Sequence, residues 1–200
     1  MNVEAKGLDY KALNEAIRAA GPSCRITGCL GQRFIGAGMS GRQVEIDGIP
    51  GNALGAYLGG GTITVNGNAQ DAVGDTMNDG SIIIHGSVGD TAGYAMRGGE
   101  IYVQGNAGYR VGIHMKAYQD KQPVIVIGGR VIFRGDVSGI RFPEQVTPHA
   151  PTAEELAQLR PLVERWCALF GGDAAALMKG PFTVVTPDSR NPYRQMYAAN

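Results

Sequence analysis

Short segments rich in β-branched residues recur along the middle of the chain, each with hydrophobic side chains at alternate positions. They occupy positions 63–65, 82–84 and 101–103, and each is followed by one polar residue and then a glycine. This pattern predicts short β-strands that end in turns. The three segments recur at a constant 19-residue spacing, so the predicted strands belong to an internal repeat.

Glycines keep the same period, in three columns: Gly36, Gly55, Gly74, Gly93 and Gly112; Gly48, Gly67, Gly86 and Gly105; Gly61, Gly80 and Gly99. Two apolar columns accompany them: Ile35, Leu54, Val73, Ala92 and Val111; Met39, Leu58, Met77, Met96 and Met115. We expect the glycines where the chain turns a corner or where backbones approach closely. The apolar columns should form stacked layers in the interior.

A 19-residue unit with one clear strand cannot bury its own core, so successive units must stack on one another. Strand above strand gives a parallel sheet that rises about 4.8 Å per turn, and parallel crossovers are right-handed. The sequence therefore predicts an all-β fold, a right-handed parallel β-helix. It contains neither a hexapeptide repeat nor the Gly-Gly-x-Gly-x-Asp units of calcium-binding rolls.

The segments on either side of the repeat have helical patterns. Asp9 is placed to cap a short amphipathic helix that ends at Gly21 and covers the first turn. Thr152 and Glu155 form a capping box for a second helix, which Pro161 restarts or kinks. The remaining C-terminal features are a short helix from Asp173, a strand at 182–185 and an extended tail near Tyr193 and Tyr197.

These patterns divide the chain into an N-terminal capping helix at 1–23, the β-helix at 24–142, and C-terminal helices with an extended strap at 143–200. The fifth unit, from Gly105 to Gly128, has a longer, 23-residue spacing, and its loop at 116–122 should protrude. Gly135 then follows Gly128 after much less than a full period, so either a turn is abbreviated there or residues are missing relative to a parent sequence.

Composition narrows the function classes. The chain has 31 glycines in 200 residues, 18 basic and 18 acidic side chains, and a formal net charge of zero. The balanced charge disfavours nucleic acid and anionic membranes as partners. No apolar run is long enough to span a membrane and no signal peptide is evident, so we expect a cytoplasmic protein. Cys24, Cys29 and Cys167 lack a close CxxC spacing and should be reduced, buried thiols.

Candidate reactive residues do not form a recognisable catalytic or metal-binding pattern. The G-x-G-x-x-G match at 36–41 consists of repeat glycines without the strand–helix context of a dinucleotide site. The histidines His85, His114 and His149 lack the spacing of metal ligands. The aspartates Asp71, Asp75, Asp79 and Asp90 are typical turn residues. The basic residues Arg97, Arg110, Lys116 and Lys121 form either a solvated surface or a patch for a partner. Asp75 is matched by Ala56 and Tyr94 in neighbouring units, so a column of acids like that of a carbohydrate-cleaving β-helix is not expected. We therefore assign no catalytic, cofactor-binding or metal-binding residue.

The units at 51–67 and 89–105 resemble the GXGXG domain of glutamate synthase, and the resemblance covers about residues 24–135. The N-terminal helix and the stretch at 152–197, with Pro181, Phe182 and Arg190 to Tyr193, resemble stand-alone forms of that domain. Such forms are subunits of glutamate synthase-like enzymes and of N-methylglutamate synthase, which acts in methylamine metabolism.

The resemblance implies a structural, non-catalytic subunit in a hetero-oligomer. Its partners would be a glutamine amidotransferase subunit and a synthase subunit that carries FMN and an iron-sulfur cluster, and this chain would bind no cofactor itself. Two alternatives keep the β-helix: the related subunit of formylmethanofuran dehydrogenase, and an independent carbohydrate-binding or carbohydrate-cleaving protein.

Overall fold

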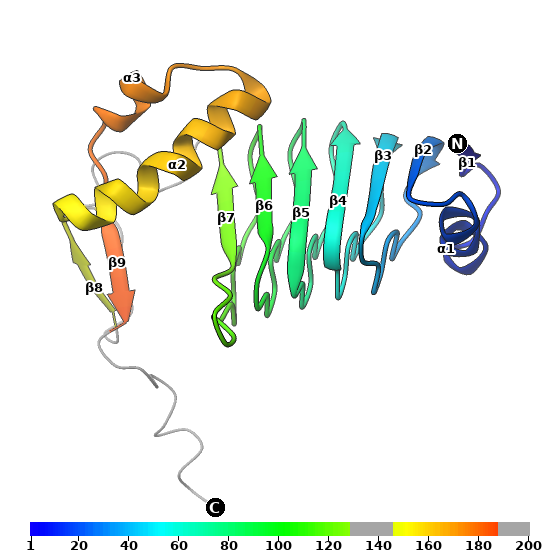
Figure 1. Ribbon diagram of the computed structural model, residues 1–200, viewed down its shortest axis with the longest axis horizontal. Helices are drawn as coiled ribbons and strands as arrows, with labels where there is room; N and C mark the ends of the chain where they lie inside the picture. The colour runs from blue at the N-terminus through cyan, green and yellow to red at the C-terminus, as the bar shows by residue number, and fades with distance from the viewer. Residues whose placement is uncertain (129–145, 188–200) are drawn as a thin grey trace, which may run out of the picture. The chain divides into compact units, whose positions relative to one another are not determined.

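The 19-residue repeat folds into a parallel β-solenoid (Figure 1). The computed structural model describes residues 1–128 and 146–187. The chain divides into two compact units, 1–130 and 131–200. The first contains one seven-stranded parallel sheet in the order β1 to β7. Its strands are β1 (Asn2–Glu4), β2 (Ser23–Leu30), β3 (Arg42–Ile49), β4 (Gly59–Asn66), β5 (Asp79–Ile84), β6 (Glu100–Val103) and β7 (Val124–Ile127).

The strand register follows the sequence period. Ile63 pairs with Ile82 and Ile82 pairs with Ile101, so each step equals one period of the repeat. Ile101 then pairs with Ile125, which makes the fifth unit one position longer than the spacing of its glycines predicted. The reason is that the Gly128 N–H donates to the Val103 carbonyl, just as the Gln104 N–H donates to the Ile84 carbonyl one turn earlier. Gly128 is therefore equivalent to Gln104 and not to Gly105. The short interval from Gly128 to Gly135 lies outside the described residues, as does the expected boundary at 142.

Each turn alternates one strand with a loop that has left-handed residues at fixed positions. The glycine column at 36, 55, 74, 93 and 112 has φ between 65° and 70°. Two further columns have positive φ mostly at residues other than glycine: Phe34, Ala53, Ala72, Thr91 and Arg110; Gly38, Tyr57, Thr76, Ala95 and His114. The sequence did not reveal these columns, because their side chains differ from turn to turn.

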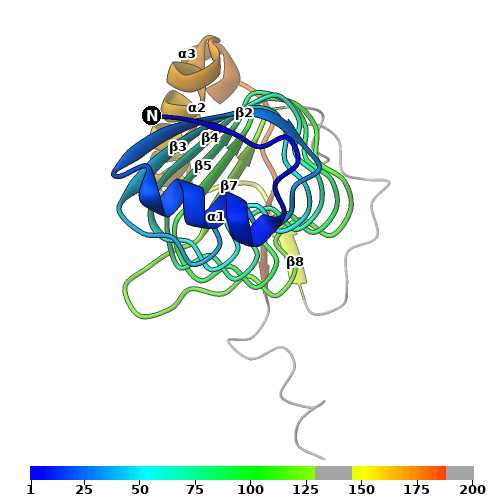
Figure 2. The same ribbon diagram turned by 90° about the vertical axis from the view of Figure 1, so that its right-hand side faces the viewer.

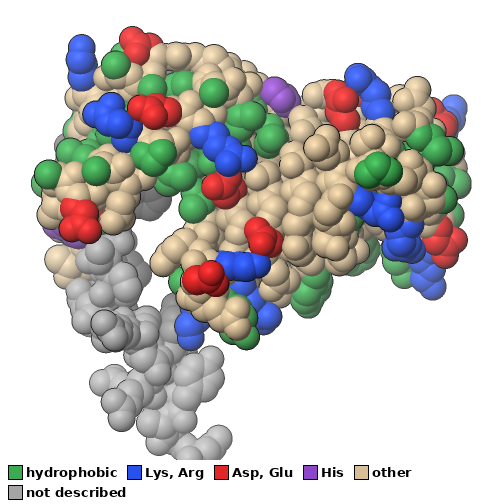
Figure 3. All heavy atoms as spheres, in the orientation of Figure 1, with side chains coloured by type: hydrophobic (Ala, Val, Ile, Leu, Met, Phe, Trp, Pro, Cys, Tyr) green, Lys and Arg blue, Asp and Glu red, His purple; other side chains and the backbone are tan. Residues whose placement is uncertain are grey.

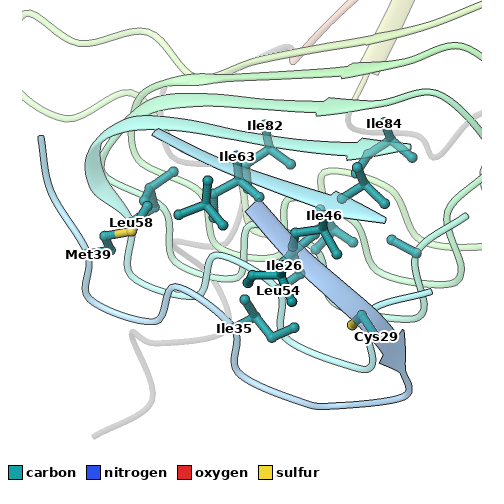
Figure 4. Packing of buried hydrophobic residues seen from close by; sticks show 14 of the residues in the cluster. Ile26, Cys29, Ile35, Met39, Ile46, Leu54, Leu58, Ile63, Ile82 and Ile84 are labelled. Carbon is teal, nitrogen blue, oxygen red and sulfur yellow. The ribbon is translucent and has the colours of Figure 1, made fainter. Parts of the chain in front are cut away.

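The interior of the solenoid is filled by stacked apolar side chains (Figure 4). Ile63, Ile82 and Ile101 point inward from consecutive strands and are fully buried. The column from Ile35 to Ala92 and the column from Met39 to Met96 lie in the same core, as predicted. At the end of the stack, Val111 is only half-buried and Met115 is 36% exposed, which differs from the expected burial of the two columns.

Helix α1 (Tyr10–Ala19) covers the first turn, as predicted, and lies across the end of the solenoid in Figure 2. Asp9 accepts a hydrogen bond from the Ala12 N–H and caps the helix. Leu13 and Ile17 are buried in the solenoid core, so the helix closes the apolar end that the first turn would otherwise expose. Strand β1, which precedes it, was not predicted, because it is too short to show a period.

The second unit pairs β8 (Val146–His149) with β9 (Val184–Pro187) in an antiparallel ribbon. It also contains α2 (Ala153–Phe170) and α3 (Ala174–Met178). The capping box of Thr152 and Glu155 and the short helix after Asp173 are as predicted, and Pro161 lies inside α2, which is one continuous helix and does not restart there. The tail near Tyr193 and Tyr197 lies outside the described residues.

Candidate functional site

The G-x-G-x-x-G segment at 36–41 lies in the loop between β2 and β3, and a strand follows it. Gly36, Gly38 and Gly41 all have positive φ. A dinucleotide site needs a helix whose N-terminus faces the pyrophosphate. The glycines of this segment therefore allow the chain to turn between β2 and β3, as the repeat indicated.

Two of the three cysteines are core residues. Cys24 and Cys29 lie on β2 and are 7% and 3% exposed, whereas Cys167 on α2 is half-buried. Burial raises the pKa of the Cys24 thiol and raises the pKa of Cys29 to about 11. Burial and Asp173 raise the pKa of Cys167 as well. The thiolate is the reactive form, so none of the three is an activated nucleophile.

We predict that iodoacetamide labels Cys167 well before Cys24 and Cys29 at about pH 8, because accessibility and thiolate content control thiol alkylation. The measurement is peptide mass spectrometry over a time course. Addition of denaturant should bring the three rates together. Early labelling of Cys29 in the native chain would contradict its placement in the core.

The histidines have separate surroundings. His85 is exposed and takes the turn position of Asn66 and Gln104. His114 is exposed, and its ring lies 5.6 Å from the Tyr94 ring in an edge contact. In the second unit, His149 Nε2 lies 3.1 Å from Glu155 Oε1. Among the residues that the structure describes, no group of three His, Cys, Asp or Glu side chains could hold a metal ion.

Two columns of polar side chains connect successive turns by hydrogen bonds. Asp71 Oδ1 accepts the Asp90 N–H at 2.9 Å, and Asp90 Oδ1 accepts the Tyr109 N–H at 2.8 Å. Asn68 and Ser87 likewise accept the N–H of the residue one period later. Asp71 and Asp90 thus share a column, although comparison of Asp75 with its equivalents predicted no acidic column. The missed signal was the 19-residue spacing of these hydrogen-bonding side chains.

The Asp90 side chain should contribute about 1 kcal/mol to the stability of the solenoid, the usual net value of such a hydrogen bond. We predict that Asp90→Ala lowers the free energy of unfolding by this amount, whereas Asp90→Asn, which keeps an acceptor oxygen, loses much less. Urea denaturation measures both. Asp120→Ala, in the exposed loop, is the control and should have no effect; equal losses for Asp90→Ala and Asp120→Ala would contradict this role.

The four basic candidates differ in their contacts. Lys121 Nζ lies 2.6 Å from Asp79 Oδ2, and this contact, with the Gly80 N–H, lowers the pKa of Asp79. The ion pair of Lys121 with Asp79 therefore connects the 116–122 loop to an earlier turn. Arg97, Arg110 and Lys116 are exposed, and no ion pair is found for them within the described part of the chain.

A shallow hollow of about 520 Å³ lies on the outer face of the sheet at β1 to β4. Polar side chains line it, among them Arg25, Gln43, Glu45 and Thr64. Arg25 is already engaged, because its guanidinium lies 2.5 Å from Asp47 and 3.2 Å from Glu45. Asn66 donates to both carboxylates and completes the network. The Arg25 guanidinium therefore binds the carboxylates of its own sheet.

Comparison with known proteins identifies relatives. The model of the GXGXG motif family matches residues 8–136, well over half of the chain. An uncharacterized protein of Methanocaldococcus jannaschii is 33% identical in an alignment that covers 98% of this chain and 95% of that protein. The alignment has 248 positions, so at least 48 of them have no residue from this 200-residue chain. No helix within the described ranges is both long and apolar enough to cross a membrane.

Proposed function

Because this chain belongs to the GXGXG motif family, we propose that it is a structural, non-catalytic subunit of a glutamate synthase-type complex. The family match over residues 8–136 is the observation that carries the proposal. The arrangement of polar groups supports it. Asp71 and Asp90 bind backbone amides, and Cys24 and Cys29 lie in the core, so these candidates for chemistry have structural roles.

The proposed role is to hold two catalytic subunits at a fixed spacing. A solenoid suits this role because stacked turns with a continuous apolar core form a stiff surface that extends turn by turn. The partners are a glutamine amidotransferase subunit and a synthase subunit that supplies FMN and an iron-sulfur cluster. We place the complex in the cytoplasm, and glutamate or N-methylglutamate is its proposed product.

Enzyme assays on the purified chain test the non-catalytic part of the proposal. We expect no glutamine hydrolysis above the buffer rate and no stoichiometric FMN binding in a fluorescence titration. The control is the same chain unfolded in urea, which reports non-specific binding of the flavin. Glutamine turnover or saturable one-to-one FMN binding by the folded chain alone would show that it is more than a scaffold.

A further inference from the structure

The last two turns that the structure describes carry large side chains at positions where earlier turns have small ones. Arg97 and Lys116 share a column with Ser40, Gly59 and Asn78. The earlier turns show that the fold needs no long cation at this position. The packing of the solenoid therefore does not account for these two long side chains.

The backbones that carry the two cations lie close together. The Lys116 N–H donates to the Met96 carbonyl at 2.9 Å, so the segments that carry Arg97 and Lys116 are stacked directly. Adjacent turns are about 4.8 Å apart, and like charges at facing positions repel each other. An acidic group from another molecule would remove this repulsion.

Exposed aromatic residues accompany the cations on the same two turns and the loop that follows. Tyr94 is 39% exposed, Tyr109 81% and Tyr118 57%. Arg110 follows Tyr109 at a left-handed position with φ of 58°, where a side chain is unfavourable compared with glycine. Tyrosine and arginine are enriched at the energetic centres of protein interfaces. Figure 3 shows basic side chains interspersed with acidic ones at the lower edge of the solenoid, beneath β6 and β7.

We propose that Tyr94, Arg97, Tyr109, Arg110, Lys116 and Tyr118 form a docking surface for a protein partner that presents aspartate and glutamate side chains. This inference rests on the proposed function, because the partner is one of the two catalytic subunits. Asp90 and Asp120 are exposed on the same turns and would repel a continuous polyanion such as nucleic acid. Discrete carboxylates on a protein can avoid them.

The test is affinity purification of the tagged full-length chain from its own cells, with partners identified by peptide mass spectrometry and flavin absorbance. The Arg97→Glu/Lys116→Glu variant should recover at least tenfold less of one catalytic subunit. The control Lys6→Glu/Arg33→Glu makes the same charge change at exposed positions of the first turns and should recover normal amounts. Recovery by the wild type should fall between about 0.1 M and 1 M salt as screening increases.

The outcomes separate the two proposals. If the wild type recovers catalytic subunits and both double variants recover the same amounts, the docking surface is wrong and the scaffold role stands. If the wild type recovers neither subunit, both proposals fail. Circular dichroism must show that both variants are folded. Binding of a labelled DNA duplex or phosphatidylserine vesicles at about 0.15 M salt, lost in Arg97→Glu/Lys116→Glu, would also overturn the assignment to a protein partner.

Discussion

Gly61→Ala should lower the free energy of unfolding by more than about 4 kcal/mol, a loss that few single substitutions produce. A Cβ atom on Gly61 would lie 2.2 Å from the Arg42 carbonyl oxygen and 2.6 Å from the Arg42 nitrogen. Arg42 and Gly61 are register partners in β3 and β4. Both contacts are with backbone, so the new methyl group can be accommodated only if the two strands separate.

Gly21→Ala is the matched control for this prediction. Gly21 has φ of 86° and Gly61 has φ of 88°, but no atom lies within 4 Å of a Cβ on Gly21. The control should therefore show only the left-handed penalty, about 1–2 kcal/mol. Guanidinium denaturation of both variants measures the difference. Equal losses would mean that the glycine column serves backbone conformation alone and not the close stacking of strands.

Gly74→Ala and Ile101→Val should be strongly coupled across the core. A Cβ on Gly74 would lie 2.5 Å from the Ile101 Cδ1 atom, so the Ile101 side chain would have to shift within a fully buried core. Gly74→Ala alone should cost about 3–4 kcal/mol, the left-handed penalty plus overpacking. Ile101→Val alone should cost about 1 kcal/mol. The double variant lacks the clashing atom and should be at least about 1 kcal/mol more stable than the sum of the single effects predicts.

A second cycle is the control. Gly38 has φ of 65°, close to the 68° of Gly74, but a Cβ there meets no atom within 4 Å. Gly38→Ala and Ile101→Val should therefore be additive. Coupling of the same size in both cycles, measured by urea denaturation, would contradict a specific contact between the first glycine column and the isoleucines of the sheet.

The repeat determined how much of the fold was predictable. In each glycine column, a Cβ atom would be too close to neighbouring atoms, which is why glycine is needed there. In the first, a Cβ would meet isoleucine side chains from the strands; in the columns of Gly48 and Gly61, it would meet backbone of the preceding turn. Because these requirements recur in every turn, the sequence shows them as a period. The cap at Asp9 and the capping box at Thr152 were predicted for a similar reason, because their side chains act locally.

The sequence did not predict the elements that neither follow the 19-residue repeat nor have a recognisable local sequence pattern. Strand β1 is short, and β8 contains Pro148, which argues against a strand except at the edge of a sheet. The longer spacing before β7 depends on how the 116–122 loop is accommodated, which the spacing of glycines alone does not reveal. In one hydrogen-bonding column the acceptor changes from Asn68 to Ser87, and in the other the aspartates at 71 and 90 extend over only two turns, so neither column forms a long repeat.

The alignment with the Methanocaldococcus jannaschii protein contains positions that have no counterpart in this chain. At least 48 aligned positions without a residue from this chain correspond to about two and a half 19-residue turns. The expected irregularity between Gly128 and Gly135 lies outside the described residues.

The most direct test of the scaffold role is the mass of the native assembly. Native mass spectrometry of the complex purified through a tag on this chain, followed by identification of each component, gives the partners and their stoichiometry. We predict a hetero-oligomer that contains a glutamine amidotransferase polypeptide and an FMN-bearing polypeptide. A molybdopterin-bearing partner would assign the chain to a different complex, and a solitary monomer of 21.0 kDa would contradict the scaffold role altogether.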